Sequence, residues 1–300
     1  MLLRRVLRIV WIVVLVGALG LALRSRWTDV GEQLATLDAW RLLLSSVIGL
    51  VGLGLSSGIW HAMLAGIGES LPLPASLRIF FVGQIGKYVP GAVWPAVTQA
   101  ALAREHGIAP RATITAVTLF LWVHLVSGAA VGAAALVATG VMPVAALATV
   151  PLLLALLSPG VLRSTLQRLL RLARRQPLRR LPDARHLLIA CAWATAMWIV
   201  YGVHLQVLTA AVGEPIGLVR AVGVFAAGWV VGFVLLIAPA GVGPREAAIV
   251  AFLPLSGAAG ILVALASRLI LTLADALWAG ATAVGPGRIR HTQRQPVRRP

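Results

Sequence analysis

Charged and hydroxyl-bearing side chains are rare in the apolar stretches of this sequence, and Lys87 and Tyr88 stand side by side in one of them. They directly precede Pro90 and Gly91, a pair that interrupts helical backbone. A lysine there could hold an anionic phosphate, while backbone N–H groups at the start of the following half-helix bind its oxygens. In the alternative interpretation, Lys87 only extends along apolar surface toward water. Both interpretations stay open.

A second group of candidates is Arg245 with Glu246, in the stretch APAGVGPRE. The helix-breaking residues before them are Pro239, Gly241 and Gly243. A proline near the first helical position and an acid in the first turn are typical of a helix start. Glu246 then either stabilises that start or acts as a ligand for a headgroup or a proton. Arg245 either binds a phosphate or pairs with an acid from another helix.

Arg268 and Asp275 form the third group, because they are seven residues apart in one apolar stretch. Two helical turns therefore separate them on one face of a helix. Ionisable groups in such surroundings are costly unless they are paired or bind a ligand. We expect this face to look into a helical bundle, where the two residues either pair with Glu246 and Arg245 or contact a ligand.

Catalytic and cofactor motifs are absent from the sequence. It contains no P-loop, no nucleophile elbow, no Asp-x-Asp pair and no pair of acids suited to acid/base catalysis. His61, His124 and His204 lack the spacing of a metal site. The only cysteine, Cys191, excludes a disulfide framework. We therefore expect no enzymatic activity, no metal and no cofactor.

The composition indicates where these residues lie. Of the 300 residues, 59% are hydrophobic and 12% are charged, whereas a soluble domain has about 25% charged residues. The apolar residues fall in runs of about 16 to 27, long enough to cross a hydrocarbon core of ~30 Å as helices. The net charge of +17 does not indicate nucleic acid binding, because the basic residues stand between apolar runs. A multi-pass membrane protein is predicted.

The predicted fold class is an all-α polytopic membrane protein with six full spans and two interrupted segments. The spans cover residues 9–23, 42–64, 112–138, 142–158, 187–212 and 259–283. The interrupted segments, 79–103 and 221–256, contain the Pro/Gly breaks. Because broken backbone at membrane depth must be buried in protein or line a wet cavity, both are predicted to be re-entrant hairpins.

The arginines predict the orientation. They cluster before the first span, beside the first hairpin, in the loop 160–186 and in the tail 285–300, all on one side of this topology. We expect that side to be cytoplasmic, with both termini there, in a prokaryotic cytoplasmic membrane. Leucine spacing in 160–186 favours a basic amphipathic helix on the inner leaflet, and a purely topogenic charge cluster is the alternative. The tail is predicted to be disordered.

An inverted repeat is predicted within one transmembrane domain, residues 1–284. Pro90 and Pro239 are 149 residues apart, half of the 300-residue chain, and the same shift brings the second span near the fifth and the third near the sixth. Each half, about 1–140 and 141–284, then has an odd number of crossings, so the halves run in opposite directions. Inverted repeats with matching breaks indicate a transport site near the bilayer midplane.

At its two breaks the sequence resembles the lysylphosphatidylglycerol synthase transmembrane-region family of flippase-like proteins. Residues 238–253, APAGVGPREAAIVAFL, are similar to the family's Pro-x-Gly-x-Gly-x-Arg-Glu signature, and residues 86–108 resemble its Pro-Gly turn with an Arg-x-x-Gly ending. The resemblance implies a helical bundle with re-entrant segments that moves a lipid between leaflets. The positions that match these motifs are Lys87, Pro90, Gly91, Arg104, Pro239, Gly241, Gly243, Arg245 and Glu246.

The resulting hypothesis is a flippase-like protein that binds or translocates an anionic lipid, either a phospholipid or a polyprenyl-phosphate-linked sugar. Its headgroup would contact Lys87, Arg245 and Arg268. One alternative is a non-transporting scaffold or partner of a lipid-linked glycosyltransferase docked on 160–186, and another is an intramembrane lipid-modifying enzyme. Expected partners are anionic membrane lipids and such an enzyme. Relatives of the multiple peptide resistance factor type add a soluble aminoacyl-transfer domain, and this chain is expected to be the membrane part alone.

Overall fold

The computed structural model describes residues 37–89, 93–172, 180–235, 243–255 and 257–284. Over these ranges the chain forms helices and connecting turns, and no strand. The predicted first span, 9–23, and the predicted disordered tail, 285–300, lie outside the described residues. The predicted loop 160–186 is described at both of its ends.

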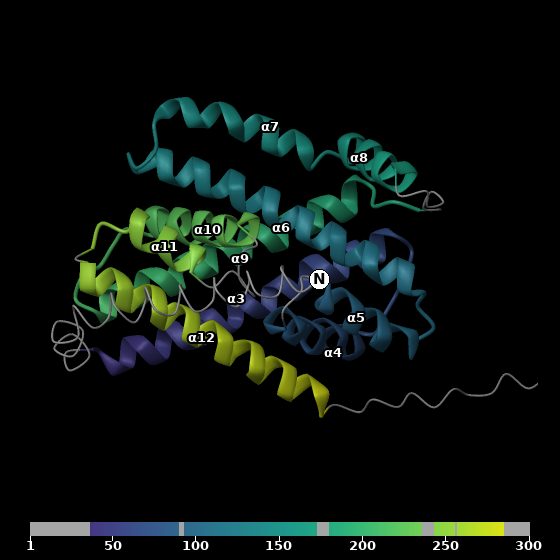
Figure 1. The fold of residues 1–300 in the computed structure, drawn as a ribbon, viewed down its shortest axis with the longest axis horizontal. Coiled ribbons are helices and arrows are strands. Elements are labelled where there is room, and N and C mark those ends of the chain that lie inside the picture. Colours follow the sequence, from purple (N-terminus) through teal and green to yellow (C-terminus); the bar gives the residue numbers. More distant parts are fainter. Residues whose placement is uncertain (1–36, 90–92, 173–179, 236–242, 256, 285–300) are drawn as a thin grey trace, which may run out of the picture.

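Four long apolar helices form the body of the molecule (Figure 1). They are α3 (Ala39–Gly66), α6 (Pro110–Ala138), α9 (Ala184–Ala211) and α12 (Gly257–Ala283). Each contains 27 to 29 residues and therefore extends about 40 Å, enough to cross the hydrocarbon core of a bilayer. The predicted spans at 42–64, 112–138, 187–212 and 259–283 correspond to these helices.

Aspartates at matching positions begin two of the long helices. The Asp38 carboxylate accepts hydrogen bonds from the backbone N–H groups of Trp40 and Arg41 at 3.0 and 3.1 Å. Asp183 accepts one from the backbone N–H of His186 at 3.0 Å. These caps satisfy N–H groups that have no partner within the helix. Hydrogen bonds from His186 lower the pKa of Asp183, so the cap on α9 stays ionised near neutral pH.

Two pairs of short helices lie between the long ones. The first pair is α4 (Leu73–Gln84), continued by the 3-10 helix η1 (Ile85–Tyr88), and α5 (Trp94–Arg104). The second pair is α10 (Leu218–Val234) and α11 (Pro244–Phe252). Gly243 begins α11 with a φ of 95°, a backbone conformation that only glycine adopts readily. The predicted segments 79–103 and 221–256 are thus short helices on either side of a break.

The main helix contacts of one half recur in the other. α3 packs along α9, while α4 packs on α12 and α10 packs on α6. Within each half, α4 contacts α5 and α10 contacts α11, and the second short helix packs on the long helix that follows it. Exchanging α3, α4, α5 and α6 for α9, α10, α11 and α12 therefore converts these contacts into one another (Figure 1). The order long, short, short, long occurs twice.

The span predicted at 142–158 corresponds to a 3-10 helix followed by a short α-helix. It contains η2 (Val144–Ala148) and α7 (Thr149–Leu156), and the chain then bends by 75° into α8 (Pro159–Leu172). Proline at the start of α8 cannot extend the preceding helix, and the Ser158 hydroxyl accepts a hydrogen bond from Val161 N–H at 3.4 Å. The described residues therefore contain four candidate spans, or five if the bent pair crosses the bilayer.

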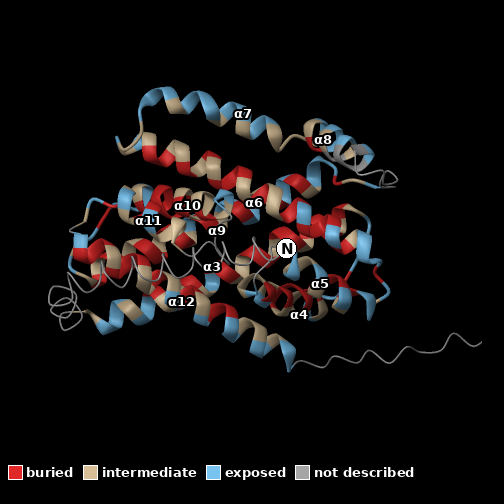
Figure 2. Cartoon of the chain, viewed as in Figure 1, coloured by how far each residue is buried: buried red, intermediate tan, exposed pale blue. Residues whose placement is uncertain are grey.

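Glycines bring neighbouring helices into close contact. A Cβ on Gly132 of α6 would lie 3.1 Å from the backbone nitrogen of Ala227 in α10, and one on Gly52 of α3 would lie 2.8 Å from the Tyr201 ring of α9. Because lipid tails are as apolar as the side chains, helix association in a bilayer depends on such close packing. Buried residues lie between the helices, and exposed apolar residues face outward (Figure 2).

Replacing Gly132 by Leu is expected to destabilise the protein by about 1–3 kcal/mol, because the added side chain must separate α6 from α10. Gly280 of α12 is the matched control, since a Cβ there meets no atom within 4 Å. Gly280→Leu should leave the thermal midpoint in detergent unchanged or raise it slightly. Equal midpoints for the two variants would contradict close packing at Gly132.

Candidate functional site

Both charged residues of α12 point into the bundle. Arg268 and Asp275 lie on the helix face that also carries the buried residues Ser267, Leu271 and Ala274. Their side chains are 17% and 4% exposed. Three leucines occupy the opposite, exposed face: Leu269, Leu273 and Leu277. α12 therefore separates an apolar outer face from a charged inner face.

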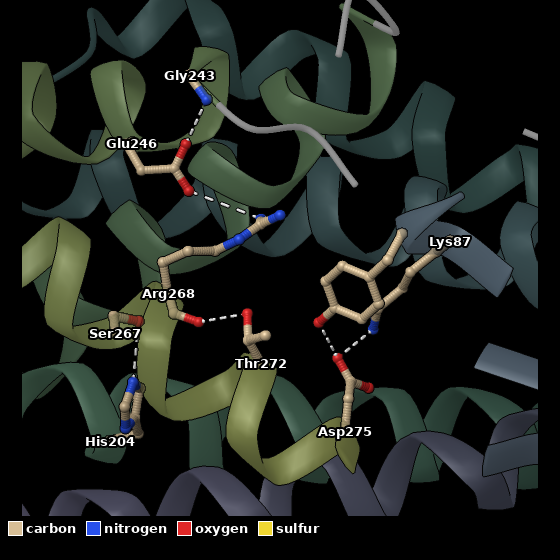
Figure 3. A network of polar contacts seen from close by, with 9 residues as sticks. Lys87, His204, Gly243, Glu246, Ser267, Arg268, Thr272 and Asp275 are labelled. Carbon is tan, nitrogen blue, oxygen red and sulfur yellow. Dashed lines mark hydrogen bonds and ion pairs between the residues drawn. The ribbon is translucent and has the colours of Figure 1, made fainter. Parts of the chain in front are cut away.

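The first break contributes a cation and a hydroxyl to Asp275. Lys87 Nζ lies 2.6 Å from Asp275 Oδ2, and the Tyr88 hydroxyl donates a hydrogen bond of 2.6 Å to the same oxygen (Figure 3). Lys87 Nζ also lies 5.5 Å from the centroid of the Tyr88 ring. η1 carries both residues at the end of α4, where α4 packs on α12. The structure thus pairs Lys87 with an acid inside the bundle.

The second break contributes an acid to Arg268. Glu246 Oε1 lies 3.6 Å from Arg268 Nη1, and Glu246 Oε2 accepts a hydrogen bond of 2.6 Å from the backbone N–H of Gly243 (Figure 3). The same carboxylate therefore stabilises the start of α11 and pairs with α12. Of the two pairings considered from the sequence, Arg268 with Glu246 is present, whereas Asp275 pairs with Lys87 in place of Arg245.

Arg245 is the cation of this site that no acid pairs with among the described residues. Its guanidinium carbon lies 4.8 Å from the centroid of the Phe225 ring on α10. Its Nη2 atom is buried and has no hydrogen-bond partner in the described chain. Arg268, Glu246, Tyr201 and Tyr88 act on it electrostatically. The contact with Phe225 stabilises the cation without neutralising it.

We call this cluster the polar centre; its members are Lys87, Tyr88, Arg245, Glu246, Arg268 and Asp275. Its described ionisable groups include three cations and two acids, so one positive charge is not compensated. A charge excluded from water is stabilised by a counter-charge or by hydrogen bonds. The arrangement is therefore suited to hold an anion that offers acceptor oxygens to Arg245.

The other predicted site residues lie elsewhere. Arg104 is exposed in the last turn of α5 and makes none of the contacts of the polar centre described above. Pro90, Gly91, Pro239 and Gly241 lie outside the described residues. Gly243 contributes its backbone N–H through the bond to Glu246.

Sequence reasoning missed two features near the polar centre. Phe225 contacts Arg245, and no local pattern distinguishes it from other apolar residues of α10. His204 joins three long helices. Its Nδ1 lies 2.8 Å from Ser45 Oγ of α3, and its Nε2 lies 2.9 Å from Ser267 Oγ of α12 (Figure 3). The serine hydroxyls near glycines in the apolar helices were the sequence feature that could have indicated the His204 contacts.

Replacing Asp275 by Asn is expected to destabilise the protein by about 3 kcal/mol, because the Lys87 ammonium then has no acid partner. The double variant Lys87→Met with Asp275→Leu should recover much of this loss, since neither charge remains. Thermal unfolding in detergent measures both effects. Asp38→Asn is the control, because asparagine also caps helices well. The prediction is wrong if the double variant is less stable than Asp275→Asn.

The chain matches a known protein family. The sequence model of a family described as "Lysylphosphatidylglycerol synthase TM region" matches residues 7–279, nearly the whole chain. The match includes both breaks, α3, α6 and α9 in full, and α12 up to residue 279. A search among curated proteins gave no match.

Proposed function

The chain belongs to the lysylphosphatidylglycerol synthase TM region family, and on this premise we propose that it binds an anionic lipid headgroup at the polar centre and moves that lipid between leaflets. The family and the apolar helices indicate a multi-pass membrane protein linked to lipid handling. The observation that carries the proposal is Arg245, a buried cation with an unbonded Nη2 and no acid partner in the described chain.

A lipid phosphate matches what Arg245 lacks. A phosphodiester carries one negative charge, and the polar centre has one uncompensated positive charge. Its oxygens accept hydrogen bonds from a planar guanidinium in a geometry that an ammonium group cannot reproduce. The headgroup therefore binds at Arg245, with Arg268 and Lys87 as the neighbouring cations.

The acyl chains stay in the bilayer while the headgroup occupies the polar centre. α12 places Arg268 and Asp275 on its inner face and Leu269, Leu273 and Leu277 on its outer face. A lipid beside α12 can therefore keep its apolar part against leucines and direct its headgroup into the bundle. This separation avoids moving acyl chains through a polar interior.

The ion pairs Lys87–Asp275 and Arg268–Glu246 suggest how lipid binding could trigger movement. A phosphate bound at Arg245 and Arg268 competes with Glu246 for Arg268, so the bond between α11 and α12 weakens when the headgroup arrives. The two halves act as an inverted repeat, in which one half rocks against the other and exposes the polar centre to each leaflet in turn. The basic helix α8 faces the cytoplasm in this arrangement.

Arg245→Gln is expected to reduce lipid translocation at least about tenfold, because glutamine offers neither the charge nor the paired donors of arginine. Purified protein is reconstituted in liposomes with fluorescent phosphatidylglycerol, and the fraction of label accessible to an external quencher is followed over time. Arg104→Gln removes an exposed arginine outside the polar centre and should keep wild-type rates.

Folding of each variant is checked by its thermal midpoint before reconstitution. Unchanged translocation by folded Arg245→Gln protein would remove Arg245 from the mechanism. An equal loss in Arg104→Gln would show that total positive charge matters, and not the polar centre. Liposomes with a polyprenyl-phosphate probe distinguish the two lipid classes that carry such a phosphate.

A second candidate function is a scaffold that docks a lipid-linked glycosyltransferase. α8 favours it, because Arg163, Arg168 and Arg171 are exposed on a helix attached mainly through α7. Such a scaffold needs no transport, so purified protein that translocates lipid without a partner counts against it. Retention of the enzyme on immobilised wild-type protein, and its loss when all three arginines are replaced by Gln, would support it.

A further inference from the structure

His124, near the middle of α6, is surrounded by aromatic rings. Its side chain is 5% exposed. The imidazole centroid lies 4.0 Å from Trp229 of α10 at an interplanar angle of 32°, 4.9 Å from Trp198 of α9, and 5.3 Å from Phe120 on its own helix. The ring is therefore held between three helix surfaces at the core of the bundle.

Neither ring nitrogen of His124 has a hydrogen-bond partner among the described residues. A neutral imidazole has one N–H donor and one acceptor nitrogen, and leaving such groups unbonded in a protein core is unfavourable. An apolar ring of similar size would pack without this cost. What histidine adds at this position is the capacity to take up a proton.

His204 shows the contrasting case within the same bundle. It is also fully buried, but Ser45 and Ser267 hydroxyls lie within 2.9 Å of its two ring nitrogens. Those bonds satisfy a neutral imidazole. His124 is enclosed instead by π faces, which attract cations but offer its ring nitrogens no conventional hydrogen bond.

We propose that His124 is a proton-binding site whose occupancy is coupled to the anionic headgroup at Arg245. The proton binds the free imidazole nitrogen, and the resulting imidazolium is stabilised by the faces of Trp229 and Trp198. The proton site stands on the geometry of the aromatic cage alone. The coupling rests on the proposed function, because it requires an anion at the polar centre.

The sign of the coupling follows from the charges that act on His124. These are Lys87 of η1 and Arg245 of α11, both positive, and no carboxylate acts on it in the described chain. The neighbouring α9 and α10 present Trp198 and Trp229, and α7 has no ionisable residue. The charges of Lys87 and Arg245 therefore oppose a positive charge on the His124 imidazole. A phosphate at Arg245 removes part of that repulsion, so headgroup and proton favour each other's binding.

Tryptophan fluorescence tests the proton site on the full chain in nanodiscs of uncharged phosphatidylcholine. An imidazolium stacked on Trp229 quenches its emission. Burial, together with Lys87 and Arg245, opposes formation of the imidazolium, so wild-type fluorescence should fall as the pH is lowered from about 6 to about 3. His124→Gln should lose this component of the titration, and His204→Gln, the matched control, should keep it. Trp229→Phe preserves the cage but removes the reporter, so it should also lose the component.

The proton site is overturned if wild-type emission does not titrate, or if folded His124→Gln and Trp229→Phe proteins both titrate as the wild type does. The fluorescence change does not depend on transport. A protein that translocates no lipid can therefore still confirm or exclude the site.

The coupling is tested by adding phosphatidylglycerol to the nanodiscs. The His124 midpoint should move up by about one pH unit, a tenfold gain in proton affinity. Arg245→Gln corrects for the lower surface pH of an anionic bilayer, and it should show a clearly smaller movement. Equal movement in wild type and Arg245→Gln would overturn the coupling and leave the proton site in place.

Discussion

Arg268 and Asp275 of α12 are the two charges on which both broken segments depend. Asp275 contacts Lys87 and Tyr88 of the first break, and Arg268 contacts Glu246 of the second. Removing an ion from water costs several kcal/mol after relaxation, so each charge of α12 requires a partner at its own depth. The breaks supply these partners because they bring polar side chains between apolar helices. One helix therefore fixes two segments that are more than 140 residues apart in sequence.

Close packing makes this electrostatic arrangement possible. A Cβ on Gly232 of α10 would lie 2.7 Å from the Cβ of Arg245, so the absence of a side chain at Gly232 leaves room for the arginine. On the first break, a Cβ at Gly86 would lie 2.8 Å from the backbone of Trp94 and Pro95. In both pairs a glycine on the first short helix lets the second approach. The bilayer offers little hydrophobic gain for bringing apolar helices together, so these contacts stabilise the breaks.

Much of the fold could be predicted from apolar runs, and less of the polar centre could. Four predicted spans became long helices, because runs of this length and composition have one stable form in a bilayer. The run at 142–158 forms η2 and α7, and it counts as a fifth candidate span only together with the bent continuation into α8, a bend that hydropathy does not register. The seven-residue spacing of Arg268 and Asp275 predicted a shared inner face. Asp275 pairs with Lys87 and not with Arg245 because of the way α4 packs on α12. No local sequence pattern predicts that packing.

The repeat of helix order does not extend to the charges. α6 is the counterpart of α12, yet its sequence from Ala112 to Ala138 has no Lys, Arg, Asp or Glu. The first break contacts α12 through η1, which lies before the break in sequence. The second contacts α12 through α11, which lies after the break. The same packing scheme therefore directs both sets of charges to α12 and leaves α6 with apolar and aromatic neighbours around His124. The two halves share a backbone arrangement, but of the counterparts α6 and α12 only α12 carries a charged face. A headgroup would therefore bind on the α12 side of the bundle. A symmetric rocking motion would then carry an asymmetric polar path along α12.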